Sequence, residues 1–314
     1  MRKTVYVFEE GAVVNKAGSH IQVRAKDEIA FDEPIANIDA IIIFTYAQIT
    51  TQALAAALEQ GINVVYTTKS SKVVGYTYQR QPQRPLLRLA QYKTAADRHA
   101  SLCVARNIVS AKIAGQRNTL AAYRMKEEAS LKPLQCAALS AKDNTQAMGF
   151  EGAAAALYFR SFSRCLKHMG FERREARPAH DPVNALLNLT YSLALSKVDS
   201  ILFAHGFDTA IGFLHTSAND RSALSLDLLE PFRGMLDRFV LKIVNRHEVC
   251  GGDFQGSDAG CVLTKKGFGK YINAYSRDIA LESRMEQFVD RLKEAITIEG
   301  EVDRLDFKDL HSLL

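Results

Sequence analysis

The sequence predicts an α+β protein with two domains, a β-rich N-terminal domain followed by an all-α C-terminal domain. Three observations support this fold class. Strand-like runs fill the first 80 residues, a segment rich in proline and arginine follows, and apolar residues then recur at helical spacing. This order is typical of two domains of different class rather than of alternating βαβ units. A chain of 314 residues is also long enough to form two domains.

The N-terminal strands are predicted from runs of β-branched and aromatic residues separated by Gly, Asn and Ser. The five runs are "KTVYVF", "SHIQVRA", "AIIIF", "INVVYTT" and "KVVGYTYQ". Residues 50–61, "TTQALAAALEQG", instead predict a helix that ends at a glycine. The small alanines of this helix indicate close packing on a sheet.

The domain boundary is predicted at residues 80–85, where "RQPQRP" combines two prolines with two arginines. We therefore expect a β-rich domain over residues 1–85, with this linker at its end. A helical domain is expected over residues 86–314.

The second domain is predicted to be helical throughout. Apolar residues recur at helical spacing from about residue 92. Breaks are expected where prolines and glycines interrupt the pattern, near Lys132–Pro133, Arg177–Pro182 and Gly251–Gly260.

The composition is that of a globular protein, with 47% hydrophobic residues. No apolar run reaches the roughly 18–20 residues that a membrane span requires, and the first residues lack the apolar core of a signal peptide. The five cysteines are odd in number and widely spaced, so a disulfide framework is not expected. These features predict a cytoplasmic protein.

A structural zinc site is a weaker interpretation of two of these cysteines. His247, Cys250 and Cys261 supply three soft ligands, but no clear fourth ligand accompanies them. Buried thiols are the favoured interpretation.

The net charge of +5 is concentrated in one segment. Residues 160–177, "RSFSRCLKHMGFERREAR", hold six basic and two acidic side chains, a net of +4. A local basic stripe is expected where a protein binds a phosphate backbone. A solvated helix face explains the same stripe equally well.

Two carboxylates lie close together before a proline. Asp227 and Glu230 are three residues apart, so they are neighbours on one helix face, opposite the apolar positions that follow. Pro231 disfavours helical geometry at Glu230, so a kink or a helix start is expected there. A kink can direct both carboxylates into a cleft. An ordinary solvated polar face is the alternative, and it is favoured by this stretch alone.

His215 and Glu151 are two further candidates. His215 ends the apolar run "AIGFLH", and Glu151 precedes the alanine-rich "GAAAALYF". Taken singly, His215 is more often a core residue, and Glu151 a first-turn acid that interacts with the helix dipole. A buried carboxylate, however, requires a partner or a metal. Two carboxylates and a histidine suit Mg²⁺ or Mn²⁺, and such an ion neutralises charge that builds up on a phosphate.

Four motifs follow one another along the chain: "EGAAAALYF", "RPAHDPVNALLNLTYSL", "GFDTAIGFLH" and "SLDLLEPFR". In order and rough spacing they resemble the family of the CRISPR-associated spacer integrase, the metal-dependent DNA endonuclease of the adaptation complex. "RLAQY" and "VLTKKGFGKYINAY" are also similar to this family, and the resemblance covers nearly the whole chain. It implies a β-rich domain that mediates dimerisation and a helical catalytic domain.

The resemblance also implies roles for individual residues. Glu151, His215 and Glu230 would bind Mg²⁺ or Mn²⁺ and carry the catalysis, with Asp227 as an auxiliary acid. The residues expected to contact DNA phosphates are Arg160, Arg164, Arg173, Arg174 and Arg177. Those expected to form the wall of the cleft are Asp181, Asn184 and Tyr191, and Asp181 is also expected to cap the next helix.

As partners, the resemblance implies double-stranded DNA fragments, CRISPR repeat DNA and a second copy of the chain. It also implies a small ferredoxin-like CRISPR protein that joins two integrase dimers into a heterohexamer. In the prokaryotic cytoplasm, this complex would insert short fragments into the repeat array as new spacers, by attack of their 3′-hydroxyls. Two alternatives stay open. One is a catalytically inactive DNA-binding scaffold of the same fold, and the other is a nuclease or transposon-type integrase that acts without the small partner.

Overall fold

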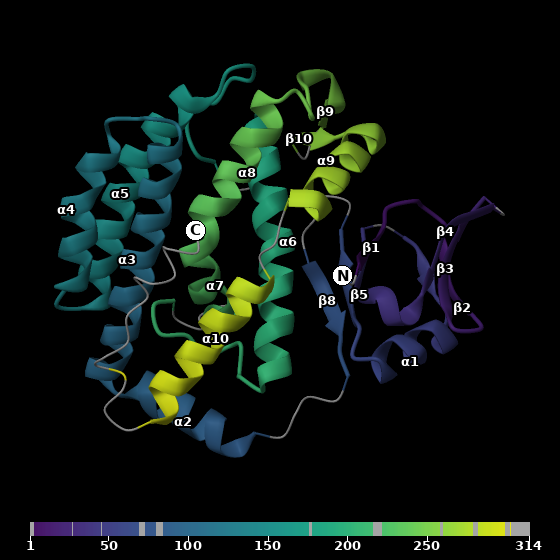
Figure 1. Ribbon diagram of the computed structural model, residues 1–314, viewed down its shortest axis with the longest axis horizontal. Helices are drawn as coiled ribbons and strands as arrows, with labels where there is room; N and C mark the ends of the chain where they lie inside the picture. The colour runs from purple at the N-terminus through teal and green to yellow at the C-terminus, as the bar shows by residue number, and fades with distance from the viewer. Residues whose placement is uncertain are drawn as a thin grey trace. The chain divides into compact units, whose positions relative to one another are not determined.

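The computed structural model describes residues 3–26, 28–44, 46–68, 73–79, 84–175, 178–215, 222–257, 260–278, 282–298 and 302. The chain folds into two compact units (Figure 1). The first contains Met1–Gln81 and Thr264–Arg277, and the second contains Pro82–Leu263 and Asp278–Leu314. This division differs from the expected one because the segment after Leu263 packs with the first unit. The roles in dimerisation and catalysis expected for the two domains stay predictions.

In the residues described, the first unit contains two four-stranded sheets. One has the strand order β1 (Lys3–Val7), β5 (Ile38–Ile43), β7 (Asn63–Thr67) and β8 (Val73–Thr77), in which only β8 is antiparallel to its neighbour. The other has the order β4 (Glu28–Pro34), β3 (His20–Ala25), β2 (Val13–Ala17) and β6 (Gln48–Ile49). Buried aliphatic side chains from both sheets form one hydrophobic core with α1 (Thr51–Glu59).

The predicted helix at residues 50–61 is confirmed as α1. Thr50 caps it by accepting a hydrogen bond from the backbone N–H of Ala53 (3.2 Å), and Gly61 follows its end with a φ of 70°. Because α1 connects β5 to its parallel neighbour β7, the unit contains a βαβ crossover that the sequence analysis did not predict. Three further strands, β2, β4 and β6, were not predicted from the sequence. β4 is an exposed strand at the edge of its sheet. Its charged residues interrupt the alternation of apolar and polar residues by which a half-buried strand is identified.

α9 (Lys265–Asp278) belongs to the first unit although it lies near the end of the chain. The ring of Phe268 packs edge-on against Phe44 and Phe8, with centroid distances of 4.8 and 5.4 Å. Lys265 also pairs with Glu9. These contacts join segments that are far apart in sequence, so local sequence patterns do not reveal them.

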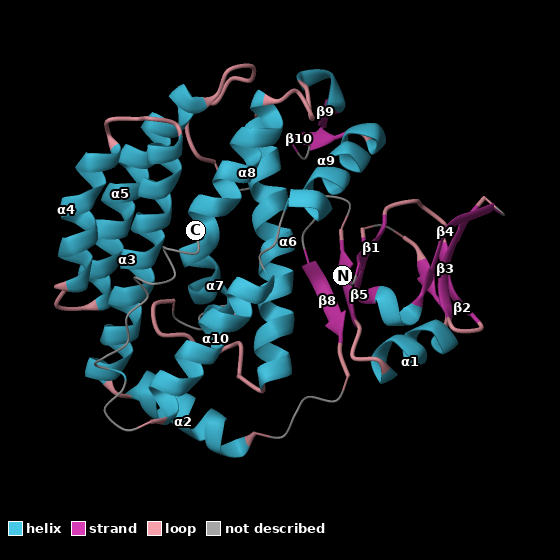
Figure 2. Ribbon diagram, viewed as in Figure 1, coloured by secondary structure: helices cyan, strands magenta, loops and turns pink. Residues whose placement is uncertain are grey.

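The second unit is mainly helical (Figure 2). Its helices are α2 (Pro85–Ala96), α3 (Arg98–Ala122), α4 (Glu128–Leu139), α5 (Asn144–Cys165), α6 (Pro182–His205), α7 (Ala223–Leu229), the 3₁₀ turn η2 (Glu230–Phe232), α8 (Arg233–Asn245) and α10 (Glu282–Thr297). α3 packs against α4, α5 and α8, whereas α6 packs against α7, α8 and α10. Among the described helices, none combines the length and the apolar character of a membrane-spanning segment.

The α+β class and the order of strands and helices are confirmed. The helical unit also contains a short antiparallel hairpin, β9 (Phe254–Ser257) and β10 (Gly260–Leu263), at the expected glycine break. The break expected near Lys132–Pro133 is wrong, because Pro133 lies inside α4. The proline removes one hydrogen bond near the helix start, while buried Leu131 and Ala138 hold α4 in place.

α8 approaches α3 very closely at two glycines. A Cβ atom on Gly234 would overlap with the backbone carbonyl group of Gly115. Thr119 on α3 donates a hydrogen bond to the carbonyl oxygens of Gly234 (2.6 Å) and Gly115 (3.1 Å). This contact places the start of α8, and η2 before it, beside the middle of α3.

Candidate active site

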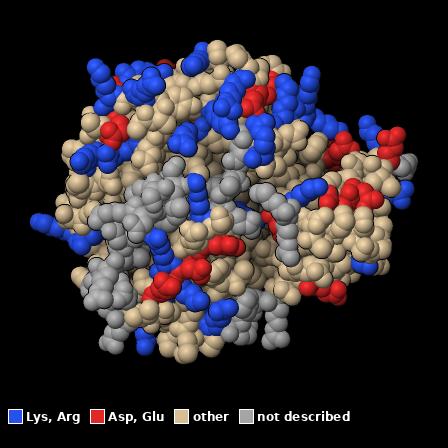
Figure 3. All heavy atoms as spheres, viewed as in Figure 1, with Lys and Arg blue, Asp and Glu red and all other residues tan. Residues whose placement is uncertain are grey.

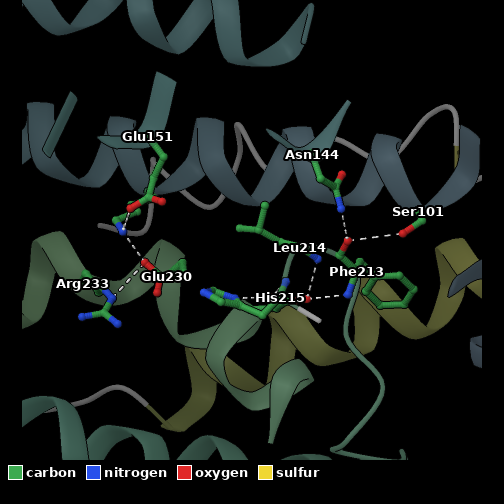
Figure 4. Close-up of polar contacts among 10 residues, drawn as sticks. Ser101, Asn144, Glu151, Phe213, Leu214, His215, Glu230 and Arg233 are labelled. Atoms are coloured by element: carbon green, nitrogen blue, oxygen red, sulfur yellow. Dashed lines mark hydrogen bonds and ion pairs between the residues drawn. The ribbon is translucent and has the colours of Figure 1, made fainter. Parts of the chain in front are cut away.

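Glu151 and Glu230 meet at the ammonium group of Lys112. Glu151 lies on α5, Glu230 is the first residue of η2, and Lys112 lies in the middle of α3. Lys112 Nζ pairs with Glu151 Oε1 and lies 2.5 Å from Glu230 Oε2. Figure 4 shows the carboxyl groups of Glu151 and Glu230 directed toward one another from two different elements. One positive charge therefore connects two carboxylates that are far apart in sequence.

Glu230 is buried at the 3₁₀ turn that separates α7 from α8. α7 ends at Leu229, η2 holds Pro231, and α8 starts at Arg233, so the α-helix is interrupted at this proline as expected. Glu230 itself keeps helical dihedral angles (φ −55°, ψ −46°), contrary to the expectation for the residue before a proline. Arg233 Nε lies 2.9 Å from Glu230 Oε2 in an ion pair without hydrogen-bond geometry. Burial alone would raise the pKa of Glu230, but the charges of Arg233 and Lys112 outweigh it and lower this pKa to about 2. The Glu230 carboxylate is therefore ionised at neutral pH.

Asp227 is fully buried and fixes the chain around His215. Its carboxylate accepts hydrogen bonds from the backbone N–H groups of Phe213 (2.6 Å), Leu214 (2.9 Å) and His215 (2.9 Å). Asp227 Oδ1 also lies 2.7 Å from His215 Nδ1. The expectation that Asp227 and Glu230 share a solvated polar face is wrong, because the tertiary fold buries both side chains. Asp227 acts as an anchor for the backbone rather than as a free auxiliary acid.

The turn that carries His215 is also held by its other neighbours. Asn144 Nδ2 (2.8 Å) and Ser101 Oγ (3.3 Å) both donate hydrogen bonds to the carbonyl oxygen of Phe213 (Figure 4). Gly212 leaves room for the anchor, since a Cβ atom there would lie 2.8 Å from Asp227 Oδ2. His215 is thus positioned by contacts from α3, α5 and α7.

The pKa of His215 is raised. The hydrogen bond with Asp227 is the largest cause, burial opposes it, and the charges of Asp227, Glu230 and Glu151 add to the increase. The negative charges of Glu230 and Glu151 therefore also favour the protonated imidazole. Because Asp227 engages Nδ1, the nitrogen that His215 can offer to a ligand is Nε2.

The three predicted metal ligands do not form one coordination set here. Within the described ranges, no group of three or more His, Cys, Asp or Glu side chains is arranged to hold a metal ion. The zinc site considered for His247, Cys250 and Cys261 is also not formed, since these described residues are not grouped around a common point. Cys250 Sγ instead donates a hydrogen bond to the carbonyl oxygen of His247 (3.4 Å). Glu151 and Glu230 hold the Lys112 ammonium, while His215 is paired with Asp227.

The donor types nevertheless fit a divalent cation. Two carboxylates already converge on one positive charge, and the ammonium of Lys112 stands where a cation between them would lie. Carboxylate oxygens with an imidazole nitrogen suit Mg²⁺ or Mn²⁺. The donor atoms of Glu151, Glu230 and His215 therefore suit the predicted metal. In the structure, the Lys112 ammonium lies between the two carboxylates.

The described arginines among those expected to bind DNA differ in their surroundings. Arg160, Arg164 and Arg173 are exposed. Arg160 follows Glu151 by nine residues on α5, and at about 100° per residue it points to the opposite side of the helix. Arg164 pairs with Glu127, and Arg173 Nε lies 3.2 Å from a carboxylate oxygen of Glu175.

Arg174 is turned inward, which corrects its assignment as a surface phosphate contact. Its guanidinium donates to Asn184 Oδ1 (2.9 Å) and Asn188 Oδ1 (2.6 Å) and lies 5.3 Å from the ring centroid of Tyr191. These partners come from the buried side of α6 and satisfy the charge internally. Arg177 lies outside the described residues.

The residues expected to form the cleft wall organise the start of α6. Asp181 caps this helix, as predicted, by accepting a hydrogen bond from the backbone N–H of Asn184 (2.8 Å). Asn184 is buried and donates to the carbonyl oxygen of Arg173 (2.8 Å). Tyr191 donates to the buried Asp237, and the Arg233 guanidinium lies 4.5 Å from its ring centroid. Tyr191 thus reaches the carboxylate pair through Arg233, whereas Asp181 and Asn184 shape the loop before α6.

Lys112 was not among the predicted site residues, although the sequence around it indicates a buried position. Lys112 stands in the apolar run "IVSAKIAG". It shares a helix face with Ala105, Ile108 and Thr119, all buried. A lysine on a buried face requires an acidic partner, and Glu151 and Glu230 are the acids that meet it.

A second basic stripe was also missed. Arg238 and Lys242 on α8 and Arg246 directly after it are spaced by four residues, and Arg238 and Arg246 are exposed. Asn245 joins this end of α8 to the end of α5, since it donates to the carbonyl oxygen of Cys165 (2.8 Å) and accepts from the N–H of Lys167 (2.9 Å). The basic ends of α5 and α8 therefore lie side by side.

The fold and the site define a class of protein with a β-rich unit and a helical unit that carries paired acids beside a histidine. The family model described as "CRISPR associated protein Cas1" matches residues 5–277. The chain belongs to the Cas1 family.

The curated relatives include CRISPR-associated endonucleases Cas1. The one from Thermus thermophilus is 32% identical over 278 residues, which cover 86% of this chain and 83% of the relative. One from Methanospirillum hungatei is 31% identical and covers 96% of this chain and 87% of the relative. A Cas4/Cas1 fusion from Rhodospirillum rubrum is 32% identical over 89% of this chain, which spans 51% of the fusion.

Solved structures share the fold. A Cas1 protein from Thermotoga maritima matches with a TM-score of 0.86 at 22% identity, over 95% of this chain and 98% of that one. A casposase bound to an integration product matches with a TM-score of 0.84 at 20% identity, over 99% and 98%. A chain of a Cas6-RT-Cas1–Cas2 complex matches with a TM-score of 0.80 at 24% identity, over 94% of this chain and 35% of that one.

Proposed function

We propose that this chain is a metal-dependent DNA endonuclease and integrase of CRISPR adaptation, which inserts short DNA fragments into the repeat array as new spacers. The observation that carries the proposal is that Glu151 and Glu230 both pair with one positive charge, the Lys112 ammonium. The negative charges of these two glutamates also act on His215 and raise its pKa. Two comparisons support it. The curated relatives are named CRISPR-associated endonucleases, and the casposase of similar fold is bound to an integration product.

Glu151, Glu230 and His215 would hold Mg²⁺ or Mn²⁺. The bound ion would neutralise charge on the scissile phosphate and help to ionise the attacking hydroxyl. The protein prepares this site in two ways. Arg233 keeps Glu230 ionised despite its burial, and Asp227 holds Nδ1 of His215 so that Nε2 is the nitrogen available for binding.

The DNA would lie on exposed basic side chains of the second unit. Lys and Arg gather along the upper edge of the face in Figure 3, over the part of this unit where α8 ends. Contacts of this kind bind phosphates with little dependence on base sequence. The proposed contacts are Arg160, Arg164, Arg173, Arg238, Lys242 and Arg246.

We propose a homodimer and a small ferredoxin-like partner of the Cas2 type, assembled as a heterohexamer. A solved chain of similar fold belongs to a complex named Cas6-RT-Cas1–Cas2, which supports this choice of partner. The alternative is an integrase that acts without the small partner.

The test is a strand-transfer assay. Purified protein is mixed with a short duplex bearing 3′-hydroxyls, a supercoiled plasmid carrying the repeat, and Mn²⁺ or Mg²⁺, with and without the small partner. We expect joined product that disappears with chelator and in Glu151→Gln. The matched control is Glu286→Gln, an exposed acid on α10, which should retain activity.

A second candidate function is a DNA-binding scaffold without catalysis. The position of Lys112 on both carboxylates favours it, because this ammonium occupies the oxygens that a metal would need. DNA binding without joining or cleavage, under all metal conditions, would support the scaffold and contradict the integrase. Joining that does not depend on the small partner would support the partner-independent enzyme.

A further inference from the structure

Lys112 occupies an unusual place for a lysine. It lies in the middle of α3 between two apolar stretches, and its side chain is 9% exposed. Lysine is almost never buried to this degree unless it is paired. Its partners are Glu151 from α5 and Glu230 from η2, so one ammonium group joins three separate elements.

The ammonium balances charges that would otherwise repel one another. Glu230 has a second cationic partner in Arg233, whereas the ion pair of Glu151 is with Lys112. Without Lys112, two carboxylates would face each other in a poorly solvated site, with Arg233 on one side only. Two like charges that face each other in a site with little water repel one another more strongly than they would in solution.

A divalent cation would need the oxygens that Lys112 now holds. Ammonium and metal ion are both positive, and they cannot share the same two oxygens at contact distance because they repel one another strongly at low dielectric. Binding of one therefore excludes the other from this position. The structure shows the site with the ammonium in place.

We propose that Lys112 is a built-in competitor of the divalent cation, which preserves the carboxylate pair in the metal-free protein and sets the affinity for the metal. The inference rests on the proposed function, because that function assigns Glu151 and Glu230 to a metal. Metal binding then requires displacement of the ammonium. Lys112 is a positioning residue that acts through the two carboxylates.

The test compares Lys112→Met with a charge-matched control, Arg98→Met. Methionine keeps a long flexible side chain without the charge, and Arg98 is an exposed residue at the start of the same helix. The probe is Mn²⁺ alone, and free Mn²⁺ is measured by electron paramagnetic resonance as protein is titrated. A second readout is the melting temperature with chelator and with saturating Mn²⁺. Neither readout depends on catalysis.

We expect Lys112→Met to bind Mn²⁺ about tenfold more tightly than the natural protein, or better, because the competing charge is gone. With chelator its melting temperature should be lower, and Mn²⁺ should raise that temperature more than in the natural protein. Arg98→Met should match the natural protein in both measurements.

Equal or weaker Mn²⁺ affinity in Lys112→Met would overturn the inference. If the natural protein and Lys112→Met both fail to bind Mn²⁺, the metal site of the proposed function is itself wrong, which is a distinct result. If Lys112→Met does not fold, Lys112→Arg replaces it, since arginine keeps a fixed charge. Lys112→Arg should bind Mn²⁺ no more tightly than the natural protein, and tighter binding would contradict the proposal.

Discussion

At the scale of single residues, the helical unit satisfies its buried charges by pairing each with a group from another element. Glu230 faces Lys112 and Arg233, and Asp227 accepts three backbone N–H groups. Asp237 differs, because the group that donates a hydrogen bond to it, the Tyr191 hydroxyl, is neutral. These environments predict opposite responses to neutralising substitutions.

Replacing Asp227 with asparagine should destabilise the protein. The amide has one acceptor oxygen instead of two and places an NH₂ group against backbone donors, so the free energy of unfolding should fall by about 3 kcal/mol. The pKa of His215 should fall toward its ordinary value, because the hydrogen bond with the Asp227 carboxylate is the main cause of its increase. Chemical denaturation and an NMR titration of the histidine measure the two effects.

Asp32→Asn is the matched control for this prediction. Asp32 Oδ1 lies 2.7 Å from His20 Nδ1, the same contact as between Asp227 and His215, but both side chains are about 40% exposed, at 42% and 40%. Because both groups are exposed to water, this pair contributes little to the free energy of unfolding. Similar losses of stability in the two variants would contradict the role of Asp227 as a buried anchor.

Replacing Asp237 with asparagine should stabilise the protein at neutral pH. Burial raises the pKa of Asp237 from 3.8 to about 6, although the hydrogen bond from Tyr191 and the charge of Arg233 oppose this. The folded state then holds the proton more tightly than the unfolded state, so stability falls as pH rises from about 4 to 6, by up to about 3 kcal/mol.

Asparagine at position 237 stays neutral at every pH. The difference between Asp237→Asn and the natural protein should therefore grow over this window and be smallest below pH 4, as followed by thermal unfolding. A difference that does not change with pH would contradict the explanation.

At the scale of elements, the contact between α3 and α8 decides where the site forms. Gly115 and Gly234 let the two backbones touch, and Thr119 fixes their register. Because Lys112 lies one turn before Gly115, and Glu230 one turn before Gly234, this contact brings the ammonium to the carboxylate. The geometry of the site depends on helix packing rather than on either helix alone.

Gly234→Ala should therefore disrupt the site as well as the fold. The added methyl group would overlap with the backbone of α3, where no side chain can move aside, so the free energy of unfolding should fall by about 3 kcal/mol. Gly152→Ala on α5 is the matched control, because a Cβ atom there meets nothing within 4 Å. The control should gain up to about 1 kcal/mol from helix propensity. Equal melting temperatures in the two variants would contradict the close approach.

At the scale of the whole molecule, the charge surplus is small but unevenly placed. The net charge is +5, and the helical unit carries basic side chains on the adjoining ends of α5 and α8. An uneven distribution of this kind favours binding to a polyanion whatever its sequence.

Replacing Arg238, Lys242 and Arg246 with alanine together should weaken binding to duplex DNA. The slope of log K against log salt should become shallower by about 0.9 for each DNA phosphate that the variant no longer neutralises. Fluorescence anisotropy at several salt concentrations measures the slope. The control replaces Lys93, Arg98 and Lys132, three exposed cations at other places in the same unit. Equal changes in the two variants would show that net charge, and not the α8 stripe, governs binding.

Local signals determined a large part of this protein. The switch from strand-like runs to helical spacing predicted the two kinds of unit, Pro231 predicted the break between α7 and α8, and Asp181 predicted a helix cap. Each of these predictions depends on residues only a few positions apart, and the conformational preferences of such residues act in any fold. The pairing of Glu151 and Glu230 was implied by resemblance to a family, and not by spacing.

Only the tertiary structure decided the partners of the charged groups. It placed Lys112 on the two glutamates, turned Arg174 toward α6, buried Asp227 beneath the His215 turn, and returned α9 to the first unit. In each case the contacting residues lie far apart in sequence. A charged group that is buried must be paired, and the packing of the whole fold decides which partner lies beside it. The periodicity of residues along one segment does not contain that information.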